Sequence, residues 1–172
     1  MRWPSRMMAA AVLSGVPSTV HALLTGHDPL AATRAAATLI PGLPLRAHDP
    51  SHREFARGNP LISRYQEGLT VLGGVAVHLV VSAFWAAVIE AVDSRAKAGG
   101  SKLMRGAVAG LLIAALDLEI IGRRHPAVRA LPRLPQWLDH VTFGVLVTAL
   151  ARPDGPASTA LSIRPPSAVG RG

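Results

Sequence analysis

The stretch LTVLGGVAVHLVVSAFWAAVI, residues 69–89, decides how this chain folds. It contains no Asp, Glu, Lys or Arg over about twenty-one residues, which is the length that an α-helix needs to cross the hydrocarbon core of a bilayer. A chain of 172 residues can rarely enclose a helix that is apolar on every side. The stretch therefore predicts a membrane-spanning helix.

The composition of the chain narrows the class of protein. With 172 residues, of which 49% are hydrophobic, the chain suits one domain rather than several. It has no cysteine, which excludes disulfides, thiolate metal ligands and a cysteine nucleophile. Its formal net charge of +8 comes mostly from scattered arginines, which suits contact with a lipid bilayer that carries anionic head groups. No basic patch interleaved with aromatic residues occurs, so we expect no nucleic-acid partner.

Three further apolar segments complete a predicted all-α fold, a polytopic membrane protein with a bundle of four transmembrane helices. We place the spans at residues 7–26, 69–91, 103–122 and 136–151, within a single transmembrane domain over residues 1–152. The third span reaches membrane length only by including Asp117 and Glu119, and the fourth only by including Asp139 and His140. Residues 153–172 are rich in Pro, Ser, Gly and Ala and predict a disordered tail. The expected location is the cell membrane, as a multi-pass protein.

A short helix is expected between the first and second spans. Asp28 followed by Pro29 is a typical helix start, because the aspartate side chain caps the first turn and a proline fits there. The helix would cover residues 30–40 and end at Pro41. About eleven residues are too few to cross a bilayer, so we expect this helix to lie at the membrane interface.

The first apolar segment has two interpretations. Residues 1–22 have the basic start, the short apolar core and the small-residue pattern of a cleaved signal peptide. The apolar character resumes at Leu23 and Leu24, however, and the whole run is long enough to span a bilayer. We favour a retained helix that is kinked near Pro17.

Each predicted span carries one ionisable side chain that we expect to face the interior: His21, His78, Asp117 and His140. Small residues that would let a neighbouring helix approach lie on the faces of the last three, namely Gly74, Gly106, Gly110 and Gly144. Glu119 points about 160 degrees away from Asp117 around the helix and belongs at the rim. Because four consecutive helices alternate in direction, the four interior side chains lie towards the same side of the membrane. The pattern predicts a common interior site.

Several chemistries could use such a site. Three imidazoles and a carboxylate suit zinc or non-haem iron, with His21, His78, Asp117 and His140 as the metal ligands. His78 and His140 could instead be cofactor-binding residues, as the axial ligands of a haem. A proton relay or a substrate gate would use the same groups without a metal. We favour the alternative that they hydrogen-bond one helix to another and hold the bundle together, since no local motif such as HExxH fixes two ligands.

Three segments, PSTVHALLTGHDPLAATRAA, HLVVSAFWA and LDLEIIGRRHPAVRALPRLPQWLDHVTFG, resemble those of uncharacterised small four-span integral membrane proteins of the actinobacterial type, over about residues 10–150. The resemblance implies a polytopic membrane fold and no particular activity. The chain has no nucleophile elbow, phosphate loop or dinucleotide fingerprint. We therefore expect a non-enzymatic membrane protein with an accessory or assembly role. A haem- or metal-binding protein and a small transporter or proton pathway are the alternatives, and a second copy of the chain or another membrane protein is the expected protein partner.

Overall fold

A computed structural model describes residues 2–40, 60–95 and 100–151 of the chain. These residues form helices joined by turns, and no strand occurs among them, which confirms the predicted all-α class. The predicted disordered tail, residues 153–172, lies outside the described residues.

The first predicted span is two helices, α1 (Trp3–Ser14) and α2 (Val16–Thr25), separated at Gly15. Pro17 occupies the first turn of α2, where its missing N–H costs nothing. The predicted kink near Pro17 is therefore a break two residues earlier, because the proline ring is accommodated by starting a new helix. Gly26 ends α2 with a φ of 69°, a left-handed conformation that glycine adopts without strain.

The predicted short helix is present as α3 (Ala31–Ala37). The helix begins at Ala31 with Leu30 at its N-cap, so Asp28 and Pro29 lie before it and not, as predicted, at its first turn. The Asp28 carboxylate accepts a hydrogen bond from the Leu30 backbone N–H at 2.9 Å, in the turn that precedes the helix. α3 packs against α5 (Pro60–Asp93), where a side chain at Gly74 would collide with the backbone of Thr33. The small residue one turn before His78 thus admits a neighbouring helix, and that neighbour is α3.

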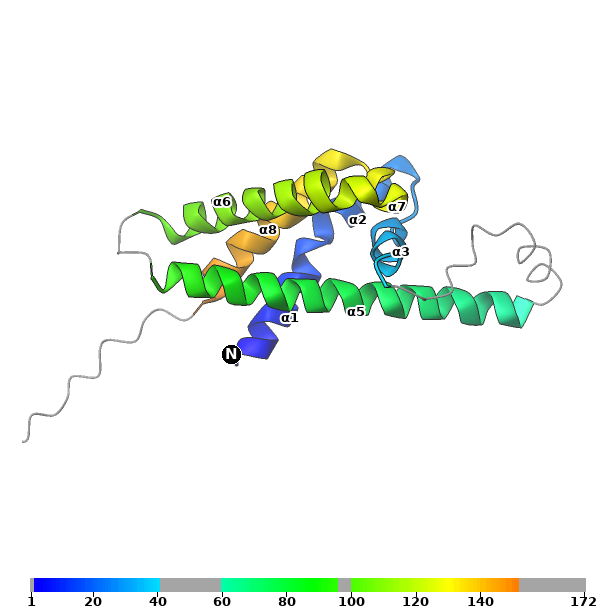
Figure 1. The fold of residues 1–172 in the computed structure, drawn as a ribbon, viewed down its shortest axis with the longest axis horizontal. Coiled ribbons are helices and arrows are strands. Elements are labelled where there is room, and N and C mark those ends of the chain that lie inside the picture. Colours follow the sequence, from blue (N-terminus) through cyan, green and yellow to red (C-terminus); the bar gives the residue numbers. More distant parts are fainter. Residues whose placement is uncertain (1, 41–59, 96–99, 152–172) are drawn as a thin grey trace, which may run out of the picture.

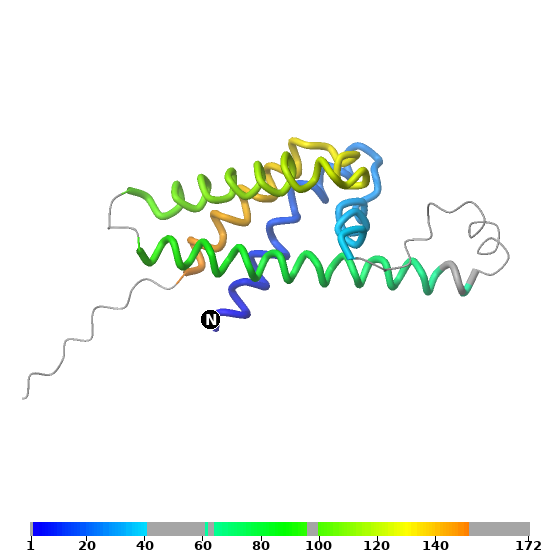
Figure 2. Tube along the Cα trace, viewed as in Figure 1, coloured from blue at the N-terminus to red at the C-terminus, as the bar shows by residue number. Residues whose placement is uncertain are grey.

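The chain returns along α5 as α6 (Lys102–Ala114), which continues into the π-helix η2 (Ala115–Ile121) (Figure 1). The 3-10 turn η3 (Gly122–Arg124) and the short helix α7 (Pro126–Arg129) then lead to α8 (Arg133–Leu150). α1, α2 and α6 run one way along the molecule and α5 and α8 run the other way, so consecutive long helices alternate in direction (Figure 2).

α8 is the central element, because it contacts α1, α2, α5 and α6. Its contact with α6 is the most extensive between two helices. A side chain at Gly106 would collide with Gly144 and Thr148, and one at Gly110 would collide with the backbone of His140 and Val141. Such close approach of two backbones is typical of small-residue faces on apolar helices. The small-residue faces predicted on these two segments therefore pack against each other.

Two helices are long and apolar enough to cross a membrane, Trp3–Thr25 and Arg64–Asp93. The third and fourth predicted spans do not meet that criterion among the described residues. The third span does not form one continuous α-helix, because its backbone changes to π geometry at Ala115. The ionisable residues of the third and fourth segments also lower their mean hydropathy. A small core of side chains joins the helices, namely Ala10, Ala86, Ile89, Ile113, Phe143 and Val147.

The α6–α8 crossing gives a first prediction. The substitution Gly110→Ala places a methyl group against the His140 carbonyl and should destabilise the folded protein by about 1–3 kcal/mol, the usual cost of overpacking. The matched substitution Gly68→Ala, on α5, meets nothing within 4 Å and should be neutral or stabilising by up to about 1 kcal/mol through helix propensity. Thermal unfolding of both variants in detergent measures the difference, and equal midpoints would refute the crossing.

Candidate functional site

A cavity of about 450 Å³ lies between the break at Gly15, α3, the middle of α5, η2 and the first half of α8. Four ionisable side chains line it, His78, Asp117, Asp139 and His140. Polar side chains without ionisable groups add to the lining, namely Ser14, Ser18, Thr19, Thr33, Ser82 and Gln136. The remaining wall is largely apolar. A concave site with a few convergent polar groups in an apolar wall is the usual form of a small-molecule site.

Asp117 joins three elements at this cavity. Its Oδ2 atom accepts a hydrogen bond from Trp85 Nε1 of α5 at 3.2 Å, and it lies 3.5 Å from His140 Nε2 of α8. Asp117 belongs to the π-helix η2, and short π segments within α-helices occur frequently at functional sites. Glu119, two residues on, pairs instead with Arg123 and Arg133. The predicted division between an interior Asp117 and a rim Glu119 is therefore present.

The imidazole of His140 joins η2 to α8. Its Nδ1 atom lies 2.8 Å from the Gln136 carbonyl, which can only accept, so Nδ1 carries a hydrogen. Its Nε2 atom lies 3.5 Å from Asp117 Oδ2, which is within ion-pair distance when the imidazole is protonated. This contact ties η2 to α8.

His78 ties α5 to α1. Its Nε2 atom lies 3.1 Å from the Ala11 carbonyl and donates to it, because a carbonyl has no hydrogen to give. The Ser14 hydroxyl donates to the same carbonyl at 3.0 Å. Ala11 lies one turn before the break at Gly15, so His78 bonds to the backbone next to the interruption.

Asp139 forms a hydrogen bond on the other side of the same break. It was not among the residues predicted for the site. Its Oδ1 atom accepts a hydrogen bond from the Ser18 backbone N–H at 2.9 Å. Ser18 is in the first turn of α2, where backbone N–H groups have no partner within the helix. Asp139 thus caps α2 from another helix. Pro17 was the sequence signal that could have predicted a capping partner here. A proline inside an apolar helix leaves nearby backbone groups without hydrogen bonds within that helix.

His21 is the predicted site residue that lies apart. Its ring stacks on His27, with ring centroids 6.5 Å apart, and it is not among the residues that line the cavity. α2 is buried at Ala22, and the preceding residue points about 100 degrees away around the helix. The expected common site of four residues is therefore corrected to three, His78, Asp117 and His140, with Asp139 added.

This arrangement does not assemble the predicted metal ligands. No group of three or more His, Cys, Asp or Glu that could hold a metal ion occurs among residues 2–40, 60–95 and 100–151. A haem between His78 and His140 would have to replace the contacts that both Nε2 atoms make, to the Ala11 carbonyl and to Asp117. Zinc, iron and haem binding stay predictions from the sequence.

Comparison with known proteins adds no assignment. No protein-family model, no curated protein and no solved structure matches this chain. The resemblance to small four-span membrane proteins stays a prediction, and the function has to be argued from the residues themselves.

Asp117 gives a second prediction. Asp117→Ala leaves Trp85 Nε1 and His140 Nε2 without their common acceptor and should destabilise the protein by about 1–2 kcal/mol. Asp117→Asn keeps a carbonyl for Trp85 and should lose less. Thermal unfolding in detergent, followed by tryptophan fluorescence, measures both variants.

The matched control is Glu119→Gln, on the same helix. Its ion pairs with Arg123 and Arg133 lie at the surface, where such pairs contribute little. Unfolding midpoints that are equal for wild type, Asp117→Ala and Glu119→Gln would contradict an interior role for Asp117.

Proposed function

We propose that this chain is a four-span integral protein of the cell membrane, without catalytic activity of its own, that acts as an accessory or assembly protein. The observation that carries the proposal is the apolar outer surface of its helices, which lies between two bands of ion pairs. Lipids with anionic head groups are the proposed surroundings, in keeping with the net charge of +8.

The outer surface of the two most apolar helices is open. Large apolar side chains are exposed along them, including Leu24 at 82%, Leu72 at 67%, Val80 at 69% and Phe84 at 59%. Only 22% of the most apolar stretch of α5 is buried, which favours lipid over a water-soluble core as its surroundings. Water-soluble monomers rarely expose apolar patches of this extent, whereas lipid tails solvate them.

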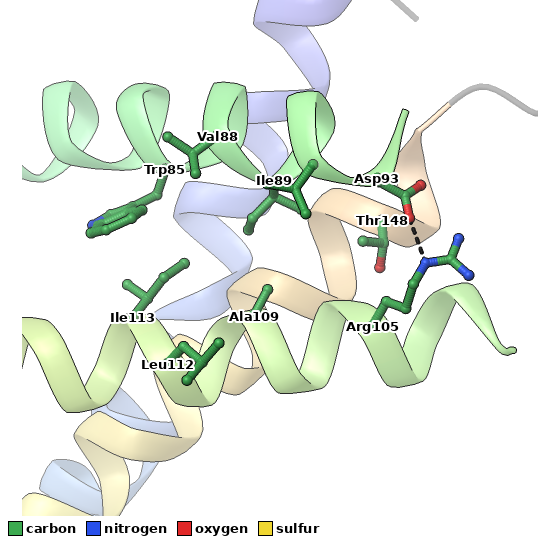
Figure 3. Close-up of a pocket in the computed structure, with 10 residues that line it drawn as sticks. Trp85, Val88, Ile89, Asp93, Arg105, Ala109, Leu112, Ile113 and Thr148 are labelled. Atoms are coloured by element: carbon green, nitrogen blue, oxygen red, sulfur yellow. Dashed lines mark hydrogen bonds and ion pairs between the residues drawn. The ribbon is translucent and has the colours of Figure 1, made fainter. Parts of the chain in front are cut away.

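Ion pairs gather at the two ends of this apolar surface. At one end Arg6 lies 3.7 Å from Glu90, and Arg105 bonds to Asp93 at 2.6 Å. Figure 3 shows the second pair closing an apolar groove between α5 and α6, of about 210 Å³, lined by Trp85, Ile89, Leu112 and Ile113 among others. This end also contains the last carbonyl of α8, because Arg6 donates to Leu150 at 3.1 Å.

The opposite end has its own ion pairs. Arg34 of α3 bonds to Glu67 of α5 at 2.7 Å, and Arg133 of α8 pairs with Glu119 of η2. Along α5, Glu67 and Glu90 are separated by about 34 Å of helix. The hydrocarbon core of a bilayer is about 30 Å thick. The two bands therefore have the spacing of two membrane interfaces.

The polar residues of the third and fourth segments support their inclusion as spans. Asp117, Asp139 and His140 lower the apolar character of these segments, yet all three line the cavity between the helices. α6 and η2 together are about 30 Å long at the usual rise per residue, and α8 is about 27 Å long. Both lengths are close to the thickness of the hydrocarbon core, and a small mismatch costs little free energy. Polar groups that face inward are compatible with lipid outside.

The contacts of α1 and α2 support a retained first span over a cleaved signal peptide. Ala10 and Ala11 are buried, the Ala11 carbonyl accepts from His78, and the Ser18 N–H donates to Asp139. Removal of this segment would leave the His78 imidazole and the Asp139 carboxylate without their hydrogen-bond partners in an apolar interior. The loss of these bonds would lower the stability of the fold by roughly several kcal/mol. We propose that the segment remains in the working protein.

Cysteine accessibility tests the four-span arrangement, and the chain has no native cysteine to interfere. Single cysteines at Ser5 and Arg95 should react with a membrane-impermeant maleimide from one side of the membrane. Cysteines at Glu67 and Arg129 should react only from the other side. A cysteine at the exposed Val80 should resist labelling in membranes, because lipid covers it.

The control is labelling after solubilisation in SDS, where all five cysteines should react alike. Rapid labelling at Val80 in intact membranes, or labelling of the other four positions from a single side, would refute the four-span arrangement.

A further inference from the structure

We propose that the cavity between the Gly15 break, η2 and α8 binds a small organic cation, a primary amine with a short apolar body. The proposal rests on the proposed membrane location only for the route by which the ligand arrives. The hydrogen-bonding groups and charges of the cavity wall determine which ligand it can bind.

Several donors of the wall are already used. His78 gives its Nε2 hydrogen to the Ala11 carbonyl, and His140 gives its Nδ1 hydrogen to the Gln136 carbonyl. The hydroxyls of Ser14 and Ser18 donate to nearby backbone carbonyls. The donors left for a ligand, the hydroxyls of Thr33 and Ser82 and the Gln136 amide, are uncharged, so they favour an anionic ligand less than a lysine or an arginine would.

Acceptors are in excess. A carboxylate can accept about four hydrogen bonds, but Asp139 receives its hydrogen bonds only from Ser18, and Asp117 is approached only by Trp85 and His140 in the described part of the chain. Ser82 also lines the cavity, and its hydroxyl makes no hydrogen bond among the described residues, so it is available to a ligand.

Asp139 has no ion-pair partner among the described residues, and Asp117 has only the imidazole of His140, at 3.5 Å. None of the described residues that line the cavity is a lysine or an arginine. Arg6, Arg34, Arg105 and Arg133 are engaged in the two bands of ion pairs at the ends of the molecule. A carboxylate in an apolar interior is strongly stabilised by a cation, and an ammonium group supplies both a charge and three donors.

The rest of the wall suits the body of such a ligand. Trp85 presents an aromatic ring, which attracts cations, and Ile113 and Phe143 add apolar surface. A volume of about 450 Å³ is within the range of small-molecule sites and towards its lower end. An arylalkylamine matches these dimensions and this chemistry.

The test is isothermal titration of the full chain, purified in detergent, with phenethylamine. Its neutral counterpart, phenethyl alcohol, and its anionic counterpart, hydrocinnamate, have nearly the same shape. We expect saturable binding of phenethylamine, and binding of the other two that is weaker by about tenfold or more, as for the loss of one charge-assisted hydrogen bond.

Asp139→Asn should weaken phenethylamine binding by about tenfold or more, because it removes the charge and keeps an oxygen for the Ser18 N–H. The matched control Glu67→Gln removes the same charge outside the cavity and should bind as wild type does. Ala32→Phe fills the cavity from α3 and should abolish binding. Thermal unfolding checks that each variant folds. If Asp139→Asn does not fold, the binding of phenethylamine to Ala32→Phe tests the proposal.

Failure to bind phenethylamine, equal binding of the alcohol, or wild-type binding by a folded Asp139→Asn variant would each overturn the proposal. A protein that does not bind the amine but conducts protons into liposomes, and loses this in Asp139→Asn, would show a proton pathway instead. The titration is done in detergent, so its result is independent of the cysteine labelling that tests the membrane arrangement.

Discussion

The hydrogen bonds on either side of the Gly15 break are the constraint on which the rest of the structure depends. Pro17 cannot donate within a helix, and the chain accommodates it by ending α1 and starting α2. In apolar surroundings the backbone groups beside such a break must find partners elsewhere. His78 of α5 donates to the Ala11 carbonyl before the break, and Asp139 of α8 accepts from the Ser18 N–H after it. These two bonds bring both helices and both ionisable side chains to one place.

The α6–α8 crossing supplies the second half of the site. Gly106 and Gly144 let the two backbones approach so closely that no side chain would fit between them. Gly110 lies against the backbone of His140, so the imidazole of that residue stands beside the end of α6. There the helix changes to π geometry, and Asp117 meets both Trp85 and His140. Packing of small residues thus determines which ionisable groups can pair.

Charge is divided between the interior and the two ends of the molecule. The arginines in ion pairs lie in two bands about one bilayer thickness apart along α5, where lipid head groups and water could also solvate them. The cavity between the bands has carboxylates and imidazoles but, in the described part of the chain, no lysine or arginine. The same separation that suits a bilayer leaves the cavity rich in acceptors, which is the physical basis for the proposed amine ligand.

The sequence alone determined the all-α class and the approximate positions of the main helices, because apolar periodicity, proline and glycine act over a few residues. It did not determine that α5 begins at Pro60, that the backbone changes to π geometry at Ala115 or that α7 forms in the return segment. It also identified Asp117 as interior and Glu119 as outer, and the glycine faces near His78, Asp117 and His140, since these follow from rotation around a single helix. Only the tertiary structure decided that the break falls at Gly15, that Asp139 belongs to the site and that His21 does not. Those outcomes depend on which backbone groups of one helix lack a hydrogen-bond partner and on which side chain of another helix lies beside them. Such pairing is set by the crossing of helices far apart in the chain, and local pattern contains no information about it.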